Sequence, residues 1–351
     1  MIIRSDAPRT DSWFTGSGPD DDVVVSSRVR LSRNIDGFPF PASLAPEETA
    51  EVQRKVERAV EASPTVFRAP HLGGVGTLER RIFVERNLLS SPPAAFPDSA
   101  VYLSSDESLA VVLNEQDHVR IVSFQAGNRL EAAYDAADCL DGELEDQLGY
   151  AVSLRWGYLS SEIKNSGTAM RVSAMLHLPA LTELGELAEV VEANFPPEIG
   201  LKRFPDADGR SRAAMFLLSN KVTLGLSERS LIDLLEDCLV MLVHYERTAR
   251  ERLLGERSEE VNRAVQAAVA RLSGVNELSD EELFELLSLL RFGIAAGLST
   301  RVSLTDVTTL FFTGQRSHVI RLISEADKLE IDEEEVNKRR ARLVRETLDQ
   351  V

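Results

Sequence analysis

Three arginines follow one another closely in the segment VVVSSRVRLSRN, residues 23–34: Arg28, Arg30 and Arg33. The β-branched run ahead of them predicts a strand, so the arginines lie toward its end. Guanidinium groups suit multidentate anions such as a phosphate chain. The segment therefore predicts an anion site, with a salt-bridged surface turn as the alternative.

Two later segments carry further charged residues that could belong to such a site. LNEQDHVRI, residues 113–121, sets Glu115 five residues before Arg120 on a predicted strand and turn. GYLSSEIKNSGTAMRVSAMLHLPAL, residues 157–181, brings Arg171 just ahead of the strand-like run VSAML. Only the tertiary fold can decide whether these residues meet the first arginines.

The bulk composition limits what the anion could be. The chain has 351 residues, 43% of them hydrophobic, and a formal net charge of −18. This size allows two domains, or one large domain with an appendage, and a sizeable core. The negative charge argues against general binding of nucleic acid or of an anionic membrane, so an anion site must be a local basic pocket.

The two cysteines, Cys139 and Cys238, have no metal-ligand spacing and suit a reducing compartment. The N-terminal residues contain no apolar signal region, and no apolar run reaches the roughly 18 residues of a membrane span. We therefore expect a cytoplasmic protein without a dedicated metal site.

Residues 23–225 mix short β-like runs with helical ones. Several runs alternate between apolar and polar residues or end in polar turns, which favours an antiparallel sheet with helices packed on it over a doubly wound parallel fold. This part is predicted to be α+β. The stretch Asn194–Arg212, rich in Pro, Gly and charge, is predicted to be a mobile loop over a site.

From Ser227 onward the apolar period becomes helical. We expect one long helix to about residue 254, a second over residues 258–272, and a third that begins at a capping box of Ser279 and Glu282. A break near Gly255 then divides the chain into a catalytic domain, residues 1–255, and an all-α domain, residues 256–351.

Taken together, SSRVRLSRN, LNEQDHVRI and GTAMR resemble the ATP:guanido phosphotransferases in order, spacing and wording. That family contains the arginine and creatine kinases and the bacterial protein-arginine kinases. LLSNKVTLGLSE is similar to the segment that closes the catalytic domain, and RRARLVRE to the helical C-terminal domain of the bacterial branch. That branch is the better match, because the arginine motif begins by Arg28 and leaves no room for the N-terminal helical domain of the small-molecule kinases.

The resemblance implies a role for each matching residue. Arg28, Arg30, Arg120 and Arg171 would bind the phosphates of ATP, and Arg33 would lie close behind. Glu115 would orient the acceptor guanidinium, whose charge calls for a carboxylate. Mg²⁺ would be held largely by phosphate oxygens and water.

At several positions the chain departs from the family pattern. Glu162 replaces the family cysteine, as a second carboxylate for the guanidinium or as a plain loop residue. Asn87 replaces a histidine near the adenine. The second family glutamate aligns with Arg210 without gaps, or with Asp208 after a two-residue insertion, and Arg203 then precedes it at the family spacing.

The C-terminal pocket that binds phosphoarginine in the bacterial kinases is also altered. Val336 and Asn337 replace its Arg-Asp pair, while Arg340 and Ala341 are kept. Sensing of phosphoarginine by this pocket is therefore not expected.

The leading hypothesis is a protein-arginine kinase that uses ATP and Mg²⁺. Its rivals are a catalytically degenerate scaffold that binds nucleotide or phosphoarginine, and a kinase for a free guanidino metabolite. The resemblance implies a homodimer, a small zinc-binding activator protein and a Clp-type protease system as partners. The apolar residues Leu283, Leu286, Leu287, Leu289 and Leu290 would form either a dimer interface or an ordinary core within the chain.

Overall fold

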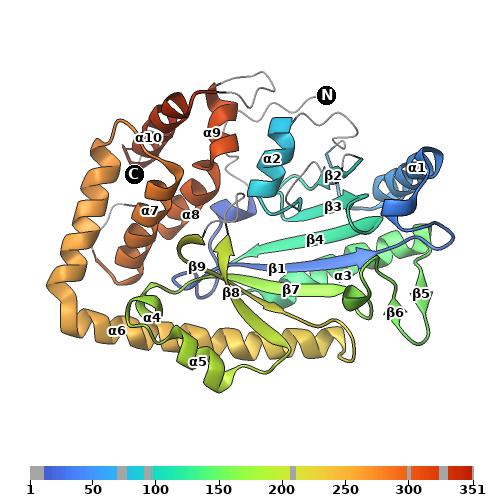
Figure 1. Cartoon of the computed structure of the whole chain (residues 1–351), viewed down its shortest axis with the longest axis horizontal. Helices are drawn as coiled ribbons and strands as arrows, with labels where there is room; N and C mark the ends of the chain where they lie inside the picture. Colours follow the sequence, from blue (N-terminus) through green and yellow to red (C-terminus); the bar gives the residue numbers. More distant parts are fainter. Residues whose placement is uncertain are drawn as a thin grey trace.

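A seven-stranded antiparallel sheet forms the centre of the structure, a computed structural model (Figure 1). The structure describes residues 12–68, 77–90, 96, 98–205, 211–298, 302–323 and 331–349. The strand order is β2-β3-β4-β1-β7-β9-β8, and all neighbours are antiparallel, as predicted. The strands are β1 (Val24–Arg33), β2 (Ala100–Leu103), β3 (Leu109–Leu113), β4 (Val119–Ala126), β7 (Met170–His177), β8 (Ile199–Pro205) and β9 (Ser211–Asn220).

Ten helices and one short hairpin surround this sheet in the described part of the chain. They are α1 (Pro46–Ala62), α2 (Thr77–Glu85), α3 (Leu130–Leu148), α4 (Pro179–Glu183), α5 (Leu187–Asn194), α6 (Glu228–Gly274), α7 (Asp280–Ala295), α8 (Leu304–Thr313), α9 (Arg316–Ile323) and α10 (Glu333–Asp349), with the hairpin β5 (Val152–Ser153) and β6 (Gly157–Tyr158). None of these helices is both long and apolar enough to cross a membrane.

Side chains of the central strand β1 alternate between the two faces of the sheet. Val29 and Leu31 are fully buried in the main core, together with the apolar stripe of α3 and the N-terminal half of α6. Arg28 and Arg30 therefore project from the opposite face. This alternation is what presents two arginines of one motif to the same side.

The long helix α6 crosses the predicted domain boundary. Its N-cap is Ser227, whose side chain accepts a hydrogen bond from the backbone N–H of Ser230. Close to Gly255 the helix has a kink at Arg257, where φ is −133° and ψ is 31°, inside one continuous run. The division into two domains at this point stays a prediction. Figure 1 shows α6 passing along the sheet and then upward beside α7 and α10.

The helices after α6 share a second apolar core. At the start of α7, Ser279 accepts from the N–H of Glu282, which is one half of the predicted capping box, while the Glu282 carboxylate pairs with Arg271. Leu283, Leu287 and Leu290 are fully buried within the single chain. Most of the apolar face expected to need a partner thus packs internally.

The prediction of a loop over residues 194–212 is wrong for most of that stretch. Strand β8 begins at Ile199, and both Ile199 and Phe204 are buried where β8 pairs with β9. Pro205 is tolerated because β8 is an edge strand and Pro205 is its last residue. Residues 206–210 lie outside the described part.

Candidate active site

Three neighbouring strands bring four predicted arginines to one face of the sheet. Arg30 on β1 lies directly opposite Arg171 on β7, and Ser32 on β1 lies opposite Arg120 on β4. Arg28 lies two residues before Arg30 and therefore on the same face. Segments separated by up to about 140 residues in the sequence thus meet through strand register alone.

These residues surround a cavity of about 120 Å³. Its walls are formed by Arg30, Ser32, Ser90, Glu115, Gln116, Asp117, Arg120, Asn165, Ala169, Met170, Arg171, Asn220, Lys221 and Thr223. Arg28 lies beside it, and its Nε donates to Ser173 Oγ at 3.2 Å. Among the wall residues, Asn220 joins β7 to β9, because its side chain bonds to the backbones of Val172 and Met170.

The cavity has an excess of positive charge. Burial, and then the nearby Arg120 and Arg171, lower the pKa of Arg28 to about 9. Burial and the same kind of repulsion hold the pKa of Arg30 well below its ordinary value. The Nε groups of Arg30 and Arg120 are buried and have no hydrogen-bond partner among the described residues. Such an arrangement is stabilised by a bound anion with several oxygens.

Glu115 is the carboxylate that meets this cluster, from the turn after β3. It is 3% exposed and accepts hydrogen bonds from the N–H and the hydroxyl of Ser90, at 2.7 and 2.9 Å. It also forms an ion pair with Arg120. Ser90 could not be identified from the sequence, because nothing in the spacing of ERNLLS shows that it contacts the turn after β3.

Asn87 contributes to the cluster through its backbone. It has the left-handed φ of 59°, which asparagine tolerates better than most residues. Its carbonyl accepts from Arg28 Nη1 at 3.4 Å, and the next carbonyl, of Leu88, accepts from Arg120. The segment after α2 therefore holds two of the four arginines.

Glu162 lies near the cavity without forming part of its wall. Its carboxylate pairs with Lys164 at 3.0 Å and accepts from Asn165, which does line the cavity. The loop ahead of it is held by buried Asp117, which accepts from the N–H of Ser161 at 2.8 Å. Asp117, which the motif analysis passed over, thus fixes the start of the Glu162 loop.

The remaining predicted residues are not brought into the cavity. Arg203 is exposed on β8 and lies over the ring of Phe216 at 5.4 Å. Asp208 and Arg210 fall outside the described residues, so their placement stays a prediction.

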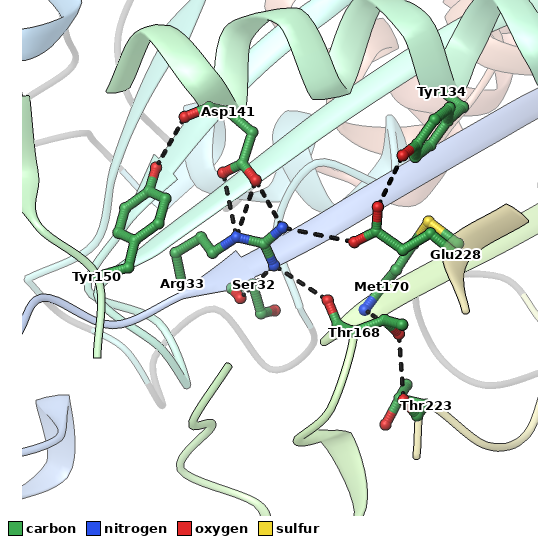
Figure 2. Close-up of polar contacts among 9 residues, drawn as sticks. All are labelled: Ser32, Arg33, Tyr134, Asp141, Tyr150, Thr168, Met170, Thr223 and Glu228. Carbon is green, nitrogen blue, oxygen red and sulfur yellow. Dashed lines mark hydrogen bonds and ion pairs between the residues drawn. The ribbon is translucent and has the colours of Figure 1, made fainter. Parts of the chain in front are cut away.

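Arg33 lies three residues after Arg30 on β1 and therefore on the opposite face of the sheet. Figure 2 shows its guanidinium in contact with the carboxylates of Asp141 and Glu228. It is 1% exposed, pairs with Asp141 of α3 at 2.6 Å, and stacks 3.6 Å from the ring centre of Tyr158. It also donates to the carbonyl of Thr168, and Thr168 bonds to Thr223 of the cavity wall. Arg33 is therefore a structural group behind the site.

Arg340, the arginine kept in the altered C-terminal pocket, also forms hydrogen bonds within the chain. It is fully buried and donates to the carbonyls of Gly314 and Leu278 and to the side chain of Asn337. Val336 is buried in an apolar cluster with residues of α2 and α9.

No cluster of three or more His, Cys, Asp or Glu side chains that could hold a metal ion occurs among the described residues.

Comparison with known proteins gives two matches that together cover most of the chain. The family described as "ATP:guanido phosphotransferase, C-terminal catalytic domain" matches residues 51–249, and "Protein-arginine kinase McsB C-terminal domain" matches residues 258–351. The protein-arginine kinase of Moorella thermoacetica is 35% identical over 84% of this chain and 87% of its own length. That of Halothermothrix orenii is 31% identical over 96% of both chains.

Solved structures show the same fold. The duplicated taurocyamine kinase of Schistosoma mansoni superposes with a TM-score of 0.60 at 22% identity, covering 78% of this chain and 41% of that one. A lombricine kinase superposes with a TM-score of 0.57 at 22% identity, covering 69% and 71%. With its arginine cluster, the buried carboxylates of Glu115 and Asp117 in the cavity wall and these matches, the chain belongs to the ATP:guanido phosphotransferase family.

Proposed function

We propose that this chain is a protein-arginine kinase, which transfers the γ-phosphoryl group of ATP to a guanidinium nitrogen of arginine in a protein. The observation that supports it best is the cavity itself, where Arg30, Arg120 and Arg171 lie together with the Glu115 carboxylate, which pairs with Arg120. Phosphoryl transfer depends on positioning and on positive charge around the phosphate oxygens. The cluster supplies both.

Each group then has a part in the reaction. The triphosphate lies among Arg28, Arg30, Arg120 and Arg171 and satisfies the unpaired guanidinium donors. As its oxygens engage Arg120, Glu115 is released to bind the target guanidinium. A guanidinium nitrogen attacks the γ-phosphorus, the N–P bond forms as the bond to the ADP oxygen breaks, and the nitrogen loses a proton to the Glu115 carboxylate.

Mg²⁺ supplies further positive charge on the phosphates when ATP is bound. Glu162 and Asp208 are proposed to modulate the acceptor side, with Arg203 near the same strand hairpin. Asn87 is proposed to lie on the adenine side of the nucleotide, with its carbonyl on Arg28.

Three features of the assembly belong to the same proposal. The chain works in the cytoplasm as a homodimer formed through residues 256–351, where Leu289 remains 39% exposed on α7. A small zinc-binding protein activates it, and a Clp-type protease system receives its products. Phosphoarginine does not regulate it through the C-terminal pocket, because Val336 and Arg340 are already packed and hydrogen-bonded.

The test is mass spectrometry for phosphoarginine after incubation of the chain with Mg-ATP and an arginine-rich protein, at neutral or mildly basic pH because the N–P bond is acid-labile. Phosphoarginine that depends on Glu115 supports the proposal. A free guanidino metabolite added in parallel tests whether the acceptor is a small molecule.

The second candidate is a nucleotide-binding scaffold without catalysis, favoured by one observation. Glu162, at the position of the family cysteine, does not line the cavity and forms its ion pair with exposed Lys164. ATP bound tightly by a chain that makes no phosphoarginine, with or without an activator, would select the scaffold.

A further inference from the structure

Residues 85–90 contact both the cavity and the helical C-terminal region. The segment begins at Glu85, the last residue of α2. The two ends of this six-residue segment make polar contacts in opposite directions.

At one end the segment holds three groups of the cavity. The carbonyls of Asn87 and Leu88 accept from Arg28 and Arg120, respectively. The N–H and hydroxyl of Ser90 donate to Glu115. A displacement of this segment therefore moves the phosphate-binding and acceptor-binding groups together.

At the other end the segment holds the N-terminus of α9. The Glu85 carboxylate, 6% exposed, accepts from the N–H groups of Ser317 and His318 at 2.9 and 3.3 Å. N–H groups in the first turn of a helix have no partner within the helix, and the helix dipole favours an anion there. Gln315 adds a hydrogen bond to the carbonyl of Glu85 at 3.3 Å.

Between these ends the segment is tightly packed. Leu88 and Leu89 are buried against Phe83 of α2 and residues of β2, β3 and β4. Leu78 and Ile82 of α2 pack on Val319 and Ile320 of α9, and Figure 1 shows the two helices as neighbours. Close-packed groups transmit a shift at one end instead of absorbing it.

We propose that Glu85 is a positioning residue that couples the helical C-terminal region to the phosphoryl-transfer site. By holding α9, it sets the positions of Arg28, Arg120 and Glu115, so a displacement of α9 changes the rate of transfer. This inference rests on the proposed function and adds a route by which the C-terminal region controls it.

The chain offers a matched control for the test. Glu246 is a fully buried carboxylate that accepts from the N–H groups of Ala180 and Leu181, at 2.9 and 3.0 Å, at the start of α4. Its hydrogen bonds resemble those of Glu85, but neither Glu246 nor any residue of α4 belongs to the cavity wall. Glu85→Gln and Glu246→Gln each replace one carboxylate oxygen by an NH₂ group, which cannot accept a hydrogen bond from a backbone N–H.

We expect Glu85→Gln to lower kcat by on the order of tenfold and to raise KM for ATP, within the range of ordinary coupling between sites. Glu246→Gln loses thermal stability but keeps kcat near the wild-type value. Glu85→Asp, which keeps the charge on a shorter side chain, recovers part of the lost rate. Equal kcat values in Glu85→Gln and Glu246→Gln, at equal folded fraction, overturn the proposal.

A second readout requires no activity. Hydrogen exchange of the Ser90 N–H, which donates to Glu115, is expected to be faster in nucleotide-free Glu85→Gln and unchanged in Glu246→Gln. Unchanged exchange in both variants overturns the coupling even if the chain is an active kinase. Faster exchange in Glu85→Gln, in a chain that transfers no phosphoryl group, supports the coupling and rejects the proposed function.

Discussion

Arg30 and Arg33 lie three residues apart on one strand and have opposite surroundings. Arg30 faces a cavity with three other arginines nearby, and its buried Nε has no partner among the described residues. Arg33 faces α3. Its guanidinium pairs with Asp141 of that helix and stacks on the ring of Tyr158 of β6. The presence of a counter-charge thus distinguishes the structural arginine, Arg33, from Arg30, which faces the cavity.

Glu115→Gln is expected to have the largest effect and tests the cavity side of the comparison. Loss of the carboxylate charge should reduce phosphoryl transfer by about 10²- to 10⁴-fold. ATP affinity should be retained, because Arg120 loses its competing ion pair. Kinetic assays together with ATP titration measure both quantities. A transfer rate near that of the wild type would show that another group orients the acceptor.

Arg33→Met tests the opposite face. It leaves Asp141 buried without its partner and should lower the free energy of unfolding by about 3 to 5 kcal/mol. The double variant Arg33→Met with Asp141→Leu should recover much of that loss, since no charge is then left unpaired. Urea unfolding at pH 7 measures both. Full stability in the single variant would mean that Arg33 is not the structural member of the pair.

Glu246 extends the comparison to a buried carboxylate. Burial affects its pKa more than its hydrogen bonds do. Burial raises the pKa of Glu246 from 4.5 to about 7, although the hydrogen bonds that it accepts from two backbone N–H groups lower it. The folded state then holds a proton that the unfolded state has lost between about pH 4.5 and 7. This group's contribution to stability therefore falls as pH rises through that window, by on the order of 3 kcal/mol.

Unfolding curves of wild type and Glu246→Gln across this pH range isolate that contribution. The difference in stability between the two should change with pH if Glu246 titrates there. A difference that stays constant from pH 4.5 to 7.5 would contradict the raised pKa.

Substitution of a clustered arginine should have a smaller effect than Arg33→Met. It should weaken ATP binding, whereas Arg33→Met lowers the free energy of unfolding. Arg28→Ala, Arg120→Ala and Arg171→Ala should each weaken ATP binding by about 1.5 to 3 kcal/mol, through loss of a charge-assisted hydrogen bond. The melting temperatures of Arg28→Ala and Arg171→Ala should hold or rise, because repulsion among the guanidiniums is relieved, whereas Arg120→Ala should also lose stability, because it leaves buried Glu115 without its ion-pair partner. Calorimetric titration and thermal unfolding check the two parts. Unchanged ATP affinity in all three would reject the phosphate site.

The smallest effect is expected at Glu162, in the loop beside the cavity. Its side chain is 38% exposed and paired with exposed Lys164, so Glu162→Gln should change stability by less than about 0.5 kcal/mol. Glu162→Cys, which restores the family residue, should raise the rate of transfer if the acceptor side is tuned by this position. An unaltered rate in both variants would leave Glu162 as a loop residue.

Much of the fold follows from local patterns. Period-two alternation and polar turns predicted the antiparallel sheet, and apolar spacing predicted the helical region after Ser227, because both signals lie within a single element. The stretch after Asn194 was misjudged because its Pro and Gly residues hid the buried Ile199 and Phe204, which only pairing with β9 stabilises.

By itself the sequence determined the motifs, their order and the strand phase that places Arg28 and Arg30 on one face. Only the tertiary structure decided which charges and hydrogen-bonding groups are paired, since Asp141, the partner of Arg33, is 108 residues away and Ser90, which donates to Glu115, is on the segment after α2. Such pairs leave no local signal, because ion pairs and hydrogen bonds depend on distance in space. The same reason hid the contact of Glu85 with α9, which lies 232 residues along the chain.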